Sequence, residues 1–289
     1  MEYCDLQIHS TASDGSLTPF QLVKKAKELG LKAISITDHD TIAGLDEAIQ
    51  AGKEFGVEII PGVELSVKFH GKEIHLLGYM FDKDNAFLRK KLGEFQKKRV
   101  GRIKRIVEKV NSYLVKEGKP TLDFNEMIKG VSGSAARPHL ARYMVKKGLV
   151  KDWDEAFDKY LVRFNSPKYN LSVEEAVELM AKSGGKLFIA HPGSARKSLT
   201  EITPDLNAQK KLIRELAGLG IKGIECYYPD HDEKAKSFYL STAKELGLLT
   251  SGGSDWHGPD SPHSMMGSIK APYNLILKIK RGSKEHPLL

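Results

Sequence analysis

Short apolar runs alternate with amphipathic segments along most of this chain. The apolar runs predict strands at residues 3–9, 33–37, 57–61, 75–81, 186–190, 223–227 and 248–251. Apolar residues that recur every three or four positions predict helices at residues 18–30, 42–55, 173–182, 209–219 and 233–246. Strands and helices in strict alternation predict parallel strand pairing, and about seven such strands are enough to close an α/β barrel.

The alternation stops between residues 82 and 172. There, the apolar residues from Leu88 to Leu114 follow helical spacing, which predicts one long amphipathic helix. We therefore expect two parts. Residues 1–85 and 167–289 would form a barrel, and residues 86–166 would form a helical insertion domain that binds substrate.

The basic charge of the chain is concentrated in this insertion. Residues 86–166 hold 20 Lys and Arg against 9 Asp and Glu, whereas the rest of the chain holds 25 against 28. A positive field of this kind attracts phosphorylated ligands. The alternative is a solvated helix surface in a Lys-rich protein, and charge alone leaves both interpretations open.

The composition excludes several classes of protein. Apolar residues make up 40% and charged residues 28% of the 289, as in globular domains, and no apolar run is long enough to span a bilayer. The first residues lack the basic start and apolar run of a secretory segment, and Cys4 and Cys226 offer no disulfide framework. We therefore expect a cytoplasmic protein that does not contact membranes.

Side chains that bind metals gather where the predicted strands end. The set is His9 with Asp14, Asp38 with His39 and Asp40, Glu64, His75, His191, and Asp255 with His257. Any one of them alone is most simply a hydrogen-bonded structural residue. Imidazoles and carboxylates that converge from several strands on one barrel mouth are what a multinuclear zinc, manganese or iron site requires. Cysteine is absent from the set, which favours a catalytic site over a closed structural zinc site.

Six groups of residues occur along the chain in an order that is typical of one family. They are Asp5-Leu6-Gln7-Ile8-His9 with Ser13-Asp14-Gly15, Thr37-Asp38-His39-Asp40, Pro61-Gly62-Val63-Glu64, Ile74-His75, Ala190-His191-Pro192 and Gly253-Ser254-Asp255-Trp256-His257. Together they resemble the motifs of the PHP (polymerase and histidinol phosphatase) family, over residues 3 to about 267. The resemblance implies a distorted (β/α)7 barrel with a helical insertion, two or three divalent metal ions, and hydrolysis of phosphoesters.

The resemblance also implies a set of metal ligands. Gln7, His9, Glu64 and Asp255 would hold a first metal, Glu64, His75 and His191 a second, and Asp14, His39 and His257 a third. Manganese, zinc or iron are the expected ions, with magnesium as a further option. The family has His-x-His where this chain has Gln7 and His9, and an amide oxygen is a weaker ligand for a transition metal than an imidazole.

The insertion contains a motif of its own, Arg137-Pro138-His139-Leu140-Ala141-Arg142. It is similar to the Arg-Pro-His-x-Ala-Arg signature of the PHP subgroup that includes nucleoside 3′,5′-bisphosphate phosphatases and 5′ to 3′ exoribonucleases. The guanidinium fork of Arg137 matches a phosphate and His139 can add a donor, so both are predicted to clamp a phosphate that does not react. A helix with Pro138 in its first turn is the alternative interpretation, and the role of Arg142 is left open.

We therefore expect a metal-dependent phosphoesterase acting on nucleoside 3′,5′-bisphosphates or on the 5′ end of short oligoribonucleotides. A hydroxide shared by two metals would attack phosphorus, with Asp38 or Asp255 orienting it. His257, His191 or a metal-bound water would protonate the leaving oxygen.

Two other functions remain open from the sequence. A histidinol-phosphatase-like enzyme would keep the fold and act on a small monoester. A non-catalytic nucleotide- or RNA-binding module would have a degenerate metal site at Gln7 and would bind RNA through the basic insertion. No protein partner is implied.

Three further residues are candidates for the pocket. His231 follows a predicted strand and could reach the pocket, and Tyr227 or Tyr228 could stack on a base.

Overall fold

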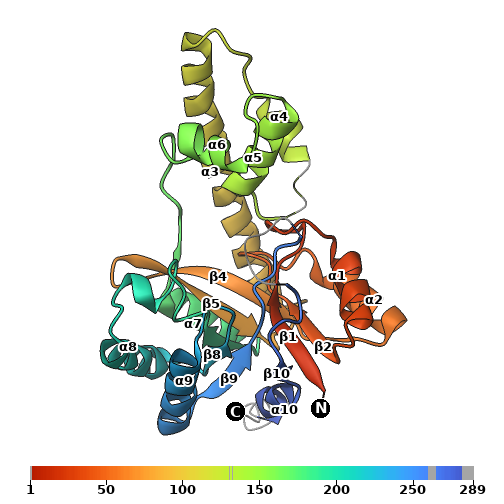
Figure 1. The fold of residues 1–289 in the computed structure, drawn as a ribbon, viewed down its shortest axis with the longest axis vertical. Helices are drawn as coiled ribbons and strands as arrows, with labels where there is room; N and C mark the ends of the chain where they lie inside the picture. Colours follow the sequence, from red (N-terminus) through yellow and green to blue (C-terminus); the bar gives the residue numbers. More distant parts are fainter. Residues whose placement is uncertain (1, 130, 132, 260–264, 282–289) are drawn as a thin grey trace.

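The computed structural model describes residues 2–129, 131, 133–259 and 265–281 (Figure 1). A mixed α/β part occupies the lower half of Figure 1, and a group of helices stands above it, connected by the long helix α3 (Ala86–Lys116). Within the described ranges, no helix combines the length and apolar character needed to cross a bilayer.

The first sheet carries the N-terminal strands. Its order is β10 (Ala271–Pro272), β1 (Tyr3–Ile8), β2 (Ala33–Ile36) and β3 (Glu58–Ile59). The pairs β1–β2 and β2–β3 are parallel, because α1 (Pro19–Glu28) and α2 (Leu45–Phe55) return the chain to the same edge. Thr18 caps α1 by accepting a hydrogen bond from the backbone N–H of Gln21, and Pro19 is its first residue, which confirms the helix start predicted there.

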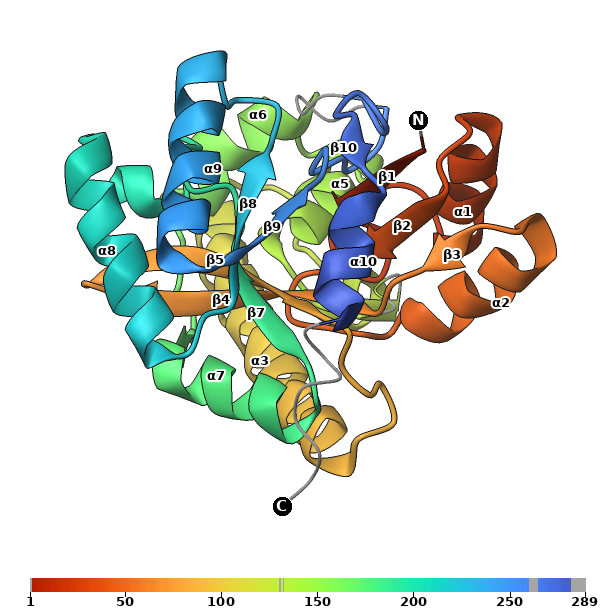
Figure 2. The same cartoon turned by 90° about the horizontal axis from the view of Figure 1, so that it is seen from below.

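The second sheet contains six strands. Their order is β6 (Leu171–Ser172), β4 (Gly62–Phe69), β5 (Lys72–Tyr79), β7 (Lys186–Ile189), β8 (Gly223–Tyr227) and β9 (Leu249–Gly252). Three helices cover its outer face: α7 (Val173–Lys182) after β6, α8 (Leu206–Leu219) after β7 and α9 (Glu233–Leu246) after β8. A short 3-10 helix, η2 (Leu199–Glu201), precedes α8. Figure 2 shows α10 (Asn274–Arg281) lying across the end of the sheets that is opposite the helical group.

Single bridges join the two sheets at two places. Ile8, at the end of β1, is bridged in parallel to Trp256 beyond β9, and His39 beyond β2 is bridged in parallel to Glu64 in β4. These contacts bring β1, β2, β4, β5, β7, β8 and β9 into one ring. The predicted α/β class is confirmed. Because isolated bridges and not ladders join the two sheets in the described residues, closure into a (β/α)7 barrel stays a prediction, and the ring is called the barrel here for brevity.

The prediction of parallel pairing throughout is wrong for three pairs, of which one joins β1 to the short β10 and the other two are neighbours in the second sheet. β4 pairs with β5 in an antiparallel hairpin, and β5 pairs antiparallel with β7. The hairpin turns at His70 and Gly71, whose φ angles of 46° and 78° lie in the left-handed region. Consequently Glu64 and His75 lie inside strands, not at carboxyl ends. The sequence Gly62–Phe69 alternates apolar and polar residues, which is a strand signal that the sequence analysis did not use.

The helical group, here called the lobe, has its own core. It contains α3 from Ile103 onward, α4 (Phe124–Lys129), α5 (Arg137–Lys146), α6 (Trp153–Ala156) and a π-helical turn, η1 (Phe157–Leu161). The first turns of α3 instead pack Leu88, Leu92 and Phe95 into the barrel core. One helix therefore belongs to both cores, and it fixes the lobe above the barrel.

A buried ion pair ties α3 to the barrel mouth. Asp40 follows β2 and accepts hydrogen bonds from the backbone N–H of Ser66 at 2.8 Å and from its hydroxyl at 3.1 Å. Arg99 of α3 forms a buried ion pair with the same carboxylate, and the Gln96 amide donates to the Asp40 carbonyl at 2.6 Å. The pair lies directly beside His39, so it also fixes the loop that carries this residue.

Replacing Arg99 by methionine tests this tie. Arg99→Met leaves the Asp40 carboxylate buried without its partner, so we expect a loss of about 3–5 kcal/mol in the free energy of unfolding, measured in urea. The control is Arg105→Met, an exposed position two turns along the same helix, where the expected change is within about 0.5 kcal/mol. Equal stability of the two variants would show that the pair contributes nothing.

Candidate metal centre

Loops and strands from both sheets bring the predicted ligands to one end of the ring. His9 directly follows β1, His39 lies beyond β2, His191 beyond β7, and Asp255 beyond β9. His191 and Asp255 have φ angles of 27° and 53°, an unfavourable conformation for residues other than glycine. Strained backbone of this kind is concentrated at functional sites.

Glu64 is the centre of the arrangement. Its side chain is completely buried, and four imidazoles surround it. The distances to its carboxylate oxygens are 2.6 Å from His75 Nδ1, 3.0 Å from His191 Nε2, 3.0 Å from His9 Nε2 and 3.4 Å from His39 Nδ1. Asp255 Oδ1 lies 3.0 Å from His9 Nε2, which places a second carboxylate in the same cluster.

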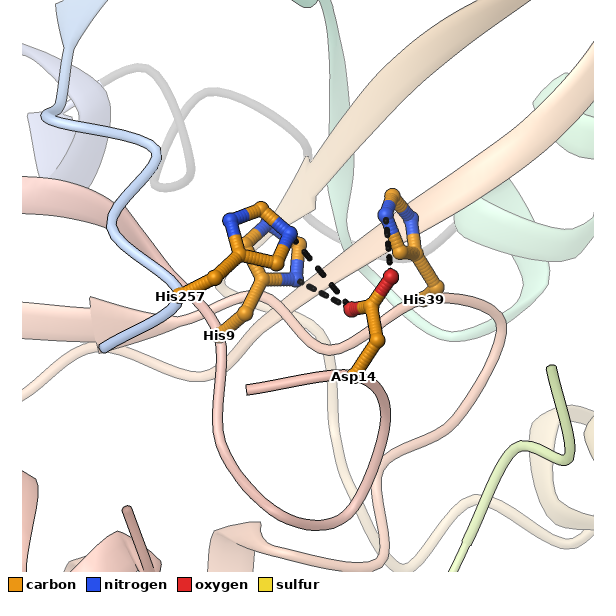
Figure 3. Close-up of side chains that lie close together, drawn as sticks. All are labelled: His9, Asp14, His39 and His257. Carbon is orange, nitrogen blue, oxygen red and sulfur yellow. Dashed lines mark ion pairs between the residues drawn. The ribbon is translucent and has the colours of Figure 1, made fainter. Parts of the chain in front are cut away.

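A third carboxylate, Asp14, forms a neighbouring cluster with three imidazoles. Figure 3 shows His9, His39 and His257 turned toward it. Asp14 lies 3.4 Å from His257 Nε2, 3.8 Å from His39 Nε2 and 3.9 Å from His9 Nδ1. The rings of His9 and His257 are stacked, with centroids 4.1 Å apart, so the two clusters are continuous.

The donor set fits divalent metal ions. Three groups have ligand atoms within 4.8 Å of one another: His9 with Asp14, His39 and His257; His39 with Glu64 and His75; and His9 with Glu64 and Asp255. Several buried atoms in these groups lie near oppositely charged atoms but make no well-aligned hydrogen bond within the described residues; they are both ring nitrogens of His9, Asp14 Oδ1 and His39 Nδ1. Buried polar atoms without partners are costly, and metal coordination would satisfy them.

The pKa shifts of His9 and Glu64 also indicate that positive charge is stabilised in this cluster. Burial disfavours a charged His9, but its contacts with Asp255 and Glu64 outweigh burial and raise the pKa of His9 well above its usual value. Burial raises the pKa of Glu64, and the charges of His75 and His39 more than reverse this, so that the pKa of Glu64 falls well below its usual range. Without metal, an imidazolium balances these carboxylates; a divalent cation would do so more strongly.

Gln7 lies beside the cluster and is tied to a buried carboxylate. With its amide oriented to satisfy its neighbours, Gln7 donates to both oxygens of Glu225, at 2.7 and 2.8 Å. Glu225 also accepts from the backbone N–H of His191 at 2.8 Å, and burial raises the pKa of Glu225 well above its usual value. The amide nitrogen is thereby committed to Glu225. Coordination of a metal by Gln7 stays a prediction.

Asp38 holds the loop that carries Asp14. Its carboxylate accepts from the backbone N–H of Ser10 at 2.8 Å, from the Ser10 hydroxyl at 2.6 Å and from the Ser13 hydroxyl at 2.5 Å. Its side chain is buried, and both of its oxygens are engaged in this way. This is the geometry of a positioning residue, and the predicted role of Asp38 in orienting the attacking oxygen stays a prediction.

The lobe contacts the same loop through α5. Arg142 donates to the Asp14 carbonyl at 2.6 Å, and Ser134 donates its backbone N–H to the Ala12 carbonyl at 2.8 Å. His139 accepts from the backbone N–H of Ala136 at 3.2 Å, as a cap of α5, and its ring also interacts with the Ser13 backbone. Arg142 therefore contacts the loop that carries Asp14, and its role in binding substrate stays open.

Arg137 lies at the first position of α5. Its guanidinium donates to the Leu161 carbonyl at 3.2 Å and lies 5.3 Å from the centre of the Phe157 ring. Burial lowers the pKa of Arg137, and the nearby charge of Glu73 opposes this. The motif therefore does begin a helix, with Pro138 in its first turn, as the alternative interpretation predicted. Phosphate binding by Arg137 and His139 stays a prediction.

The residues after β8 support the centre. Tyr228 is buried and donates its hydroxyl to Asp255 Oδ2 at 3.0 Å, so its ring is not available to stack on a base. His231 is bound on both sides, with Nδ1 3.0 Å from the Cys226 carbonyl and Nε2 accepting from the Gly193 N–H at 3.1 Å. His231 therefore fixes the turn beyond His191.

Sequence reasoning missed a second layer of ionic groups. Glu73 forms a close ion pair with Lys168, accepts from Asn170 at 3.0 Å and lies 3.4 Å from His75 Nε2. Burial, together with the charges of Lys197 and Arg99, lowers the pKa of Lys168 to about 7. The alternation of Glu73 with His75 along β5 places both on one face and could have indicated the carboxylate, but nothing local marks Lys168.

Comparisons with known proteins identify a family model and several relatives that this chain resembles. The PHP domain family model matches residues 5–166. A 5′-3′ exoribonuclease of Haemophilus influenzae is 36% identical over 258 residues, covering 88% of this chain and 90% of the relative. A 3′,5′-nucleoside bisphosphate phosphatase of Chromobacterium violaceum is 31% identical over 267 residues, covering 90% and 88%.

Solved structures show the same fold. A crystal structure from Bifidobacterium adolescentis, assigned as a metal-dependent phosphoesterase, has a TM-score of 0.82 at 26% identity, covering 96% of this chain and 95% of that one. An amidohydrolase from Chromobacterium violaceum with bound sulfate has a TM-score of 0.76 at 27% identity, covering 96% of each chain.

Gly15 provides a test of the Asp14 loop. A Cβ at Gly15 would lie 2.2 Å from the backbone oxygen of His9, so the loop must shift, and with it Asp14. We expect Gly15→Ala to retain at least one metal ion fewer than the wild type after dialysis, measured by inductively coupled plasma mass spectrometry. The control, Gly93→Ala on α3, meets no atom within 4 Å and should keep the wild-type content. Equal metal content in both variants would argue against Asp14 as a ligand.

Metal removal should also lower stability. An ion that binds only the folded chain stabilises it by about 2.7 kcal/mol when present at roughly 100 times its Kd. Thermal unfolding followed by circular dichroism should therefore show a lower midpoint after chelation, with recovery when manganese is restored. A midpoint that responds to neither treatment contradicts the metal centre.

Proposed function

This chain belongs to the PHP-domain family, and from that premise we propose that it is a metal-dependent phosphoesterase acting on nucleotides. The substrates we propose are nucleoside 3′,5′-bisphosphates and the 5′ end of short oligoribonucleotides. One observation carries the proposal: the carboxylate and imidazole cluster around Glu64 lies at the barrel end beneath a basic lobe. A structural metal site would need no such lobe.

We propose the following ligands. His9, Glu64 and Asp255, with Gln7, would hold a first ion, Glu64, His75 and His191 a second, and Asp14, His39 and His257 a third. Divalent ions in such a site lower the pKa of bound water and neutralise the oxygens of a phosphoryl group. Manganese, zinc or iron suit this mixture of imidazole and carboxylate.

The chain's own residues orient the reaction. Tyr228 donates to one oxygen of Asp255 and leaves the other directed at His9, so Asp255 enters the cluster in a fixed orientation. His257 Nδ1 lies 2.7 Å from the Asp255 carbonyl, which accepts its proton and turns Nε2 toward Asp14. With 16% of its side chain exposed, His257 lies at the open edge of the centre, where its Nε2 could either coordinate the third ion or give a proton to a leaving oxygen, but not both at once.

Substrate choice would lie in the lobe. Its net charge favours ligands with more than one phosphate, and the guanidinium of Arg137 lies at the start of α5, against Phe157 of the lobe. We propose that Arg137 holds the 5′-phosphate while the 3′-phosphate, or the first phosphodiester, reaches the metal ligands. Binding energy gained at the remote phosphate would then position the reacting one.

The proposal is tested by phosphate release. Purified protein loaded with manganese should release phosphate from adenosine 3′,5′-bisphosphate or mononucleotides from 5′-phosphorylated short RNA, and chelation should abolish both activities. Comparison of the two substrates decides between phosphatase and exonuclease. No turnover of either substrate by metal-loaded protein would refute the proposed function.

Replacement of Arg137 separates the clamp from the chemistry. Arg137→Ala should raise KM for adenosine 3′,5′-bisphosphate roughly 10- to 100-fold, as expected for loss of a charged hydrogen bond, and should leave KM for p-nitrophenyl phosphate nearly unchanged. Arg163→Ala is the matched control, because Arg163 also lies against aromatic rings of the lobe, those of Tyr113 and Phe164. Equal losses on both substrates would rule out the clamp.

A further inference from the structure

Two arginines and two aromatic rings form a row on the lobe. The Trp153 and Phe157 rings are stacked, with centroids 5.2 Å apart and planes inclined by 24°. The Arg142 guanidinium lies 5.8 Å from the Trp153 ring, and that of Arg137 lies 5.3 Å from the Phe157 ring. Cations against aromatic faces hold both in place, because the negative face of the ring attracts them.

The Arg142 end of this row contacts the metal centre, and the Arg137 end interacts with it through charge. Arg142 donates to the carbonyl of Asp14, whose carboxylate belongs to the cluster of Figure 3. At the other end, the charge of Arg137 interacts with Glu73, which lies 3.4 Å from His75. The row therefore lies over the barrel end that carries the proposed ligands, and it joins α5 to α6 and η1.

Trp153 is the exposed member of the aromatic pair, and Phe157 is partly buried against the lobe core. The Trp153 side chain is 39% exposed, although a large aromatic residue is normally buried in a core. Asp152 caps the helix that begins at Trp153 by accepting from the Glu155 N–H at 2.9 Å. At Phe157 the helix widens into a π-helical turn, a local irregularity that is frequent at functional sites.

We propose that Trp153, supported from behind by Phe157, forms the subsite for the nucleobase of the substrate. This inference rests on the proposed function, because it assigns a place to the base of a nucleotide whose phosphates lie at the metal centre and at Arg137. Aromatic rings and guanidinium planes are the surfaces on which proteins stack unpaired bases, without selecting one base over another. A platform of this kind gives a preference for nucleotides over other phosphate esters.

Fluorescence can report on the platform without catalysis. The chain contains two tryptophans, and Trp256 is only 4% exposed. In manganese-loaded protein, adenosine 5′-monophosphate should quench the fluorescence of Trp153, whereas ribose 5-phosphate, which has the same phosphate and no base, should not. In Trp153→Phe the quenching should vanish while binding, measured by calorimetry, persists.

Affinity provides the second measurement. Loss of base stacking should weaken binding of adenosine 5′-monophosphate to Trp153→Ala by about tenfold and leave binding of ribose 5-phosphate unchanged. The matched control is Phe20→Ala, because Phe20 is also 39% exposed and also packs against a second ring, that of Phe55, but lies on α1 of the barrel. This variant should bind both ligands as the wild type does.

The outcomes distinguish this inference from the proposed function. If metal-dependent phosphate release occurs but the wild type binds adenosine 5′-monophosphate no more tightly than ribose 5-phosphate, the platform is wrong and the phosphoesterase stands. Equal loss of both ligands in Trp153→Ala also refutes the platform, because stacking cannot act on a ligand without a base. Selective loss of the nucleotide supports it, whether or not adenosine 3′,5′-bisphosphate is hydrolysed.

Discussion

The Glu64 carboxylate is buried in the middle of this protein, and a buried charge is tolerated only where other charges balance it. Imidazoles from four separate segments meet this requirement, each within 3.4 Å of a carboxylate oxygen. They can do so only because β1, β2, β4, β5 and β7 converge on one end of the ring. The antiparallel β4–β5 hairpin is essential here, since it directs Glu64 and His75 into the same space from adjacent strands. The arrangement of the strands therefore determines which side chains surround Glu64.

The lobe and the metal centre depend on each other. Asp14, on the loop after β1, is held from the barrel side by Asp38 and from the lobe side by Arg142 of α5. The loop after β2 is similarly fixed by the pair of Asp40 with Arg99 of α3. An element that we propose to bind nucleotide therefore also positions the proposed metal ligands. Second-layer contacts of this kind tune metal affinity, and they connect substrate recognition to the chemistry in physical terms.

Local patterns predicted most of the elements and the parallel pairs β1–β2, β2–β3, β7–β8 and β8–β9, but not the antiparallel pairs. The helix at Val173–Lys182 and the strand near Gly223–Tyr227 follow directly from apolar periodicity. The antiparallel hairpin was missed because Pro61 and Gly62 concealed the start of β4. The sequence could not predict the roles of Lys168 or of the Trp153–Phe157 row, because these depend on contacts with residues that are distant in the sequence. The candidate metal ligands could be identified from the sequence because they lie within the family motifs, and their coordination of metal stays a prediction.

Anomalous diffraction from crystals grown with manganese tests the central claim most directly. The account predicts two or three strong peaks at the barrel end, at least one of them within about 2.0–2.3 Å of a Glu64 oxygen and others beside Asp14 and His191. Manganese bound only at surface carboxylates, with the Glu64 cluster unchanged and free of anomalous signal, would contradict it.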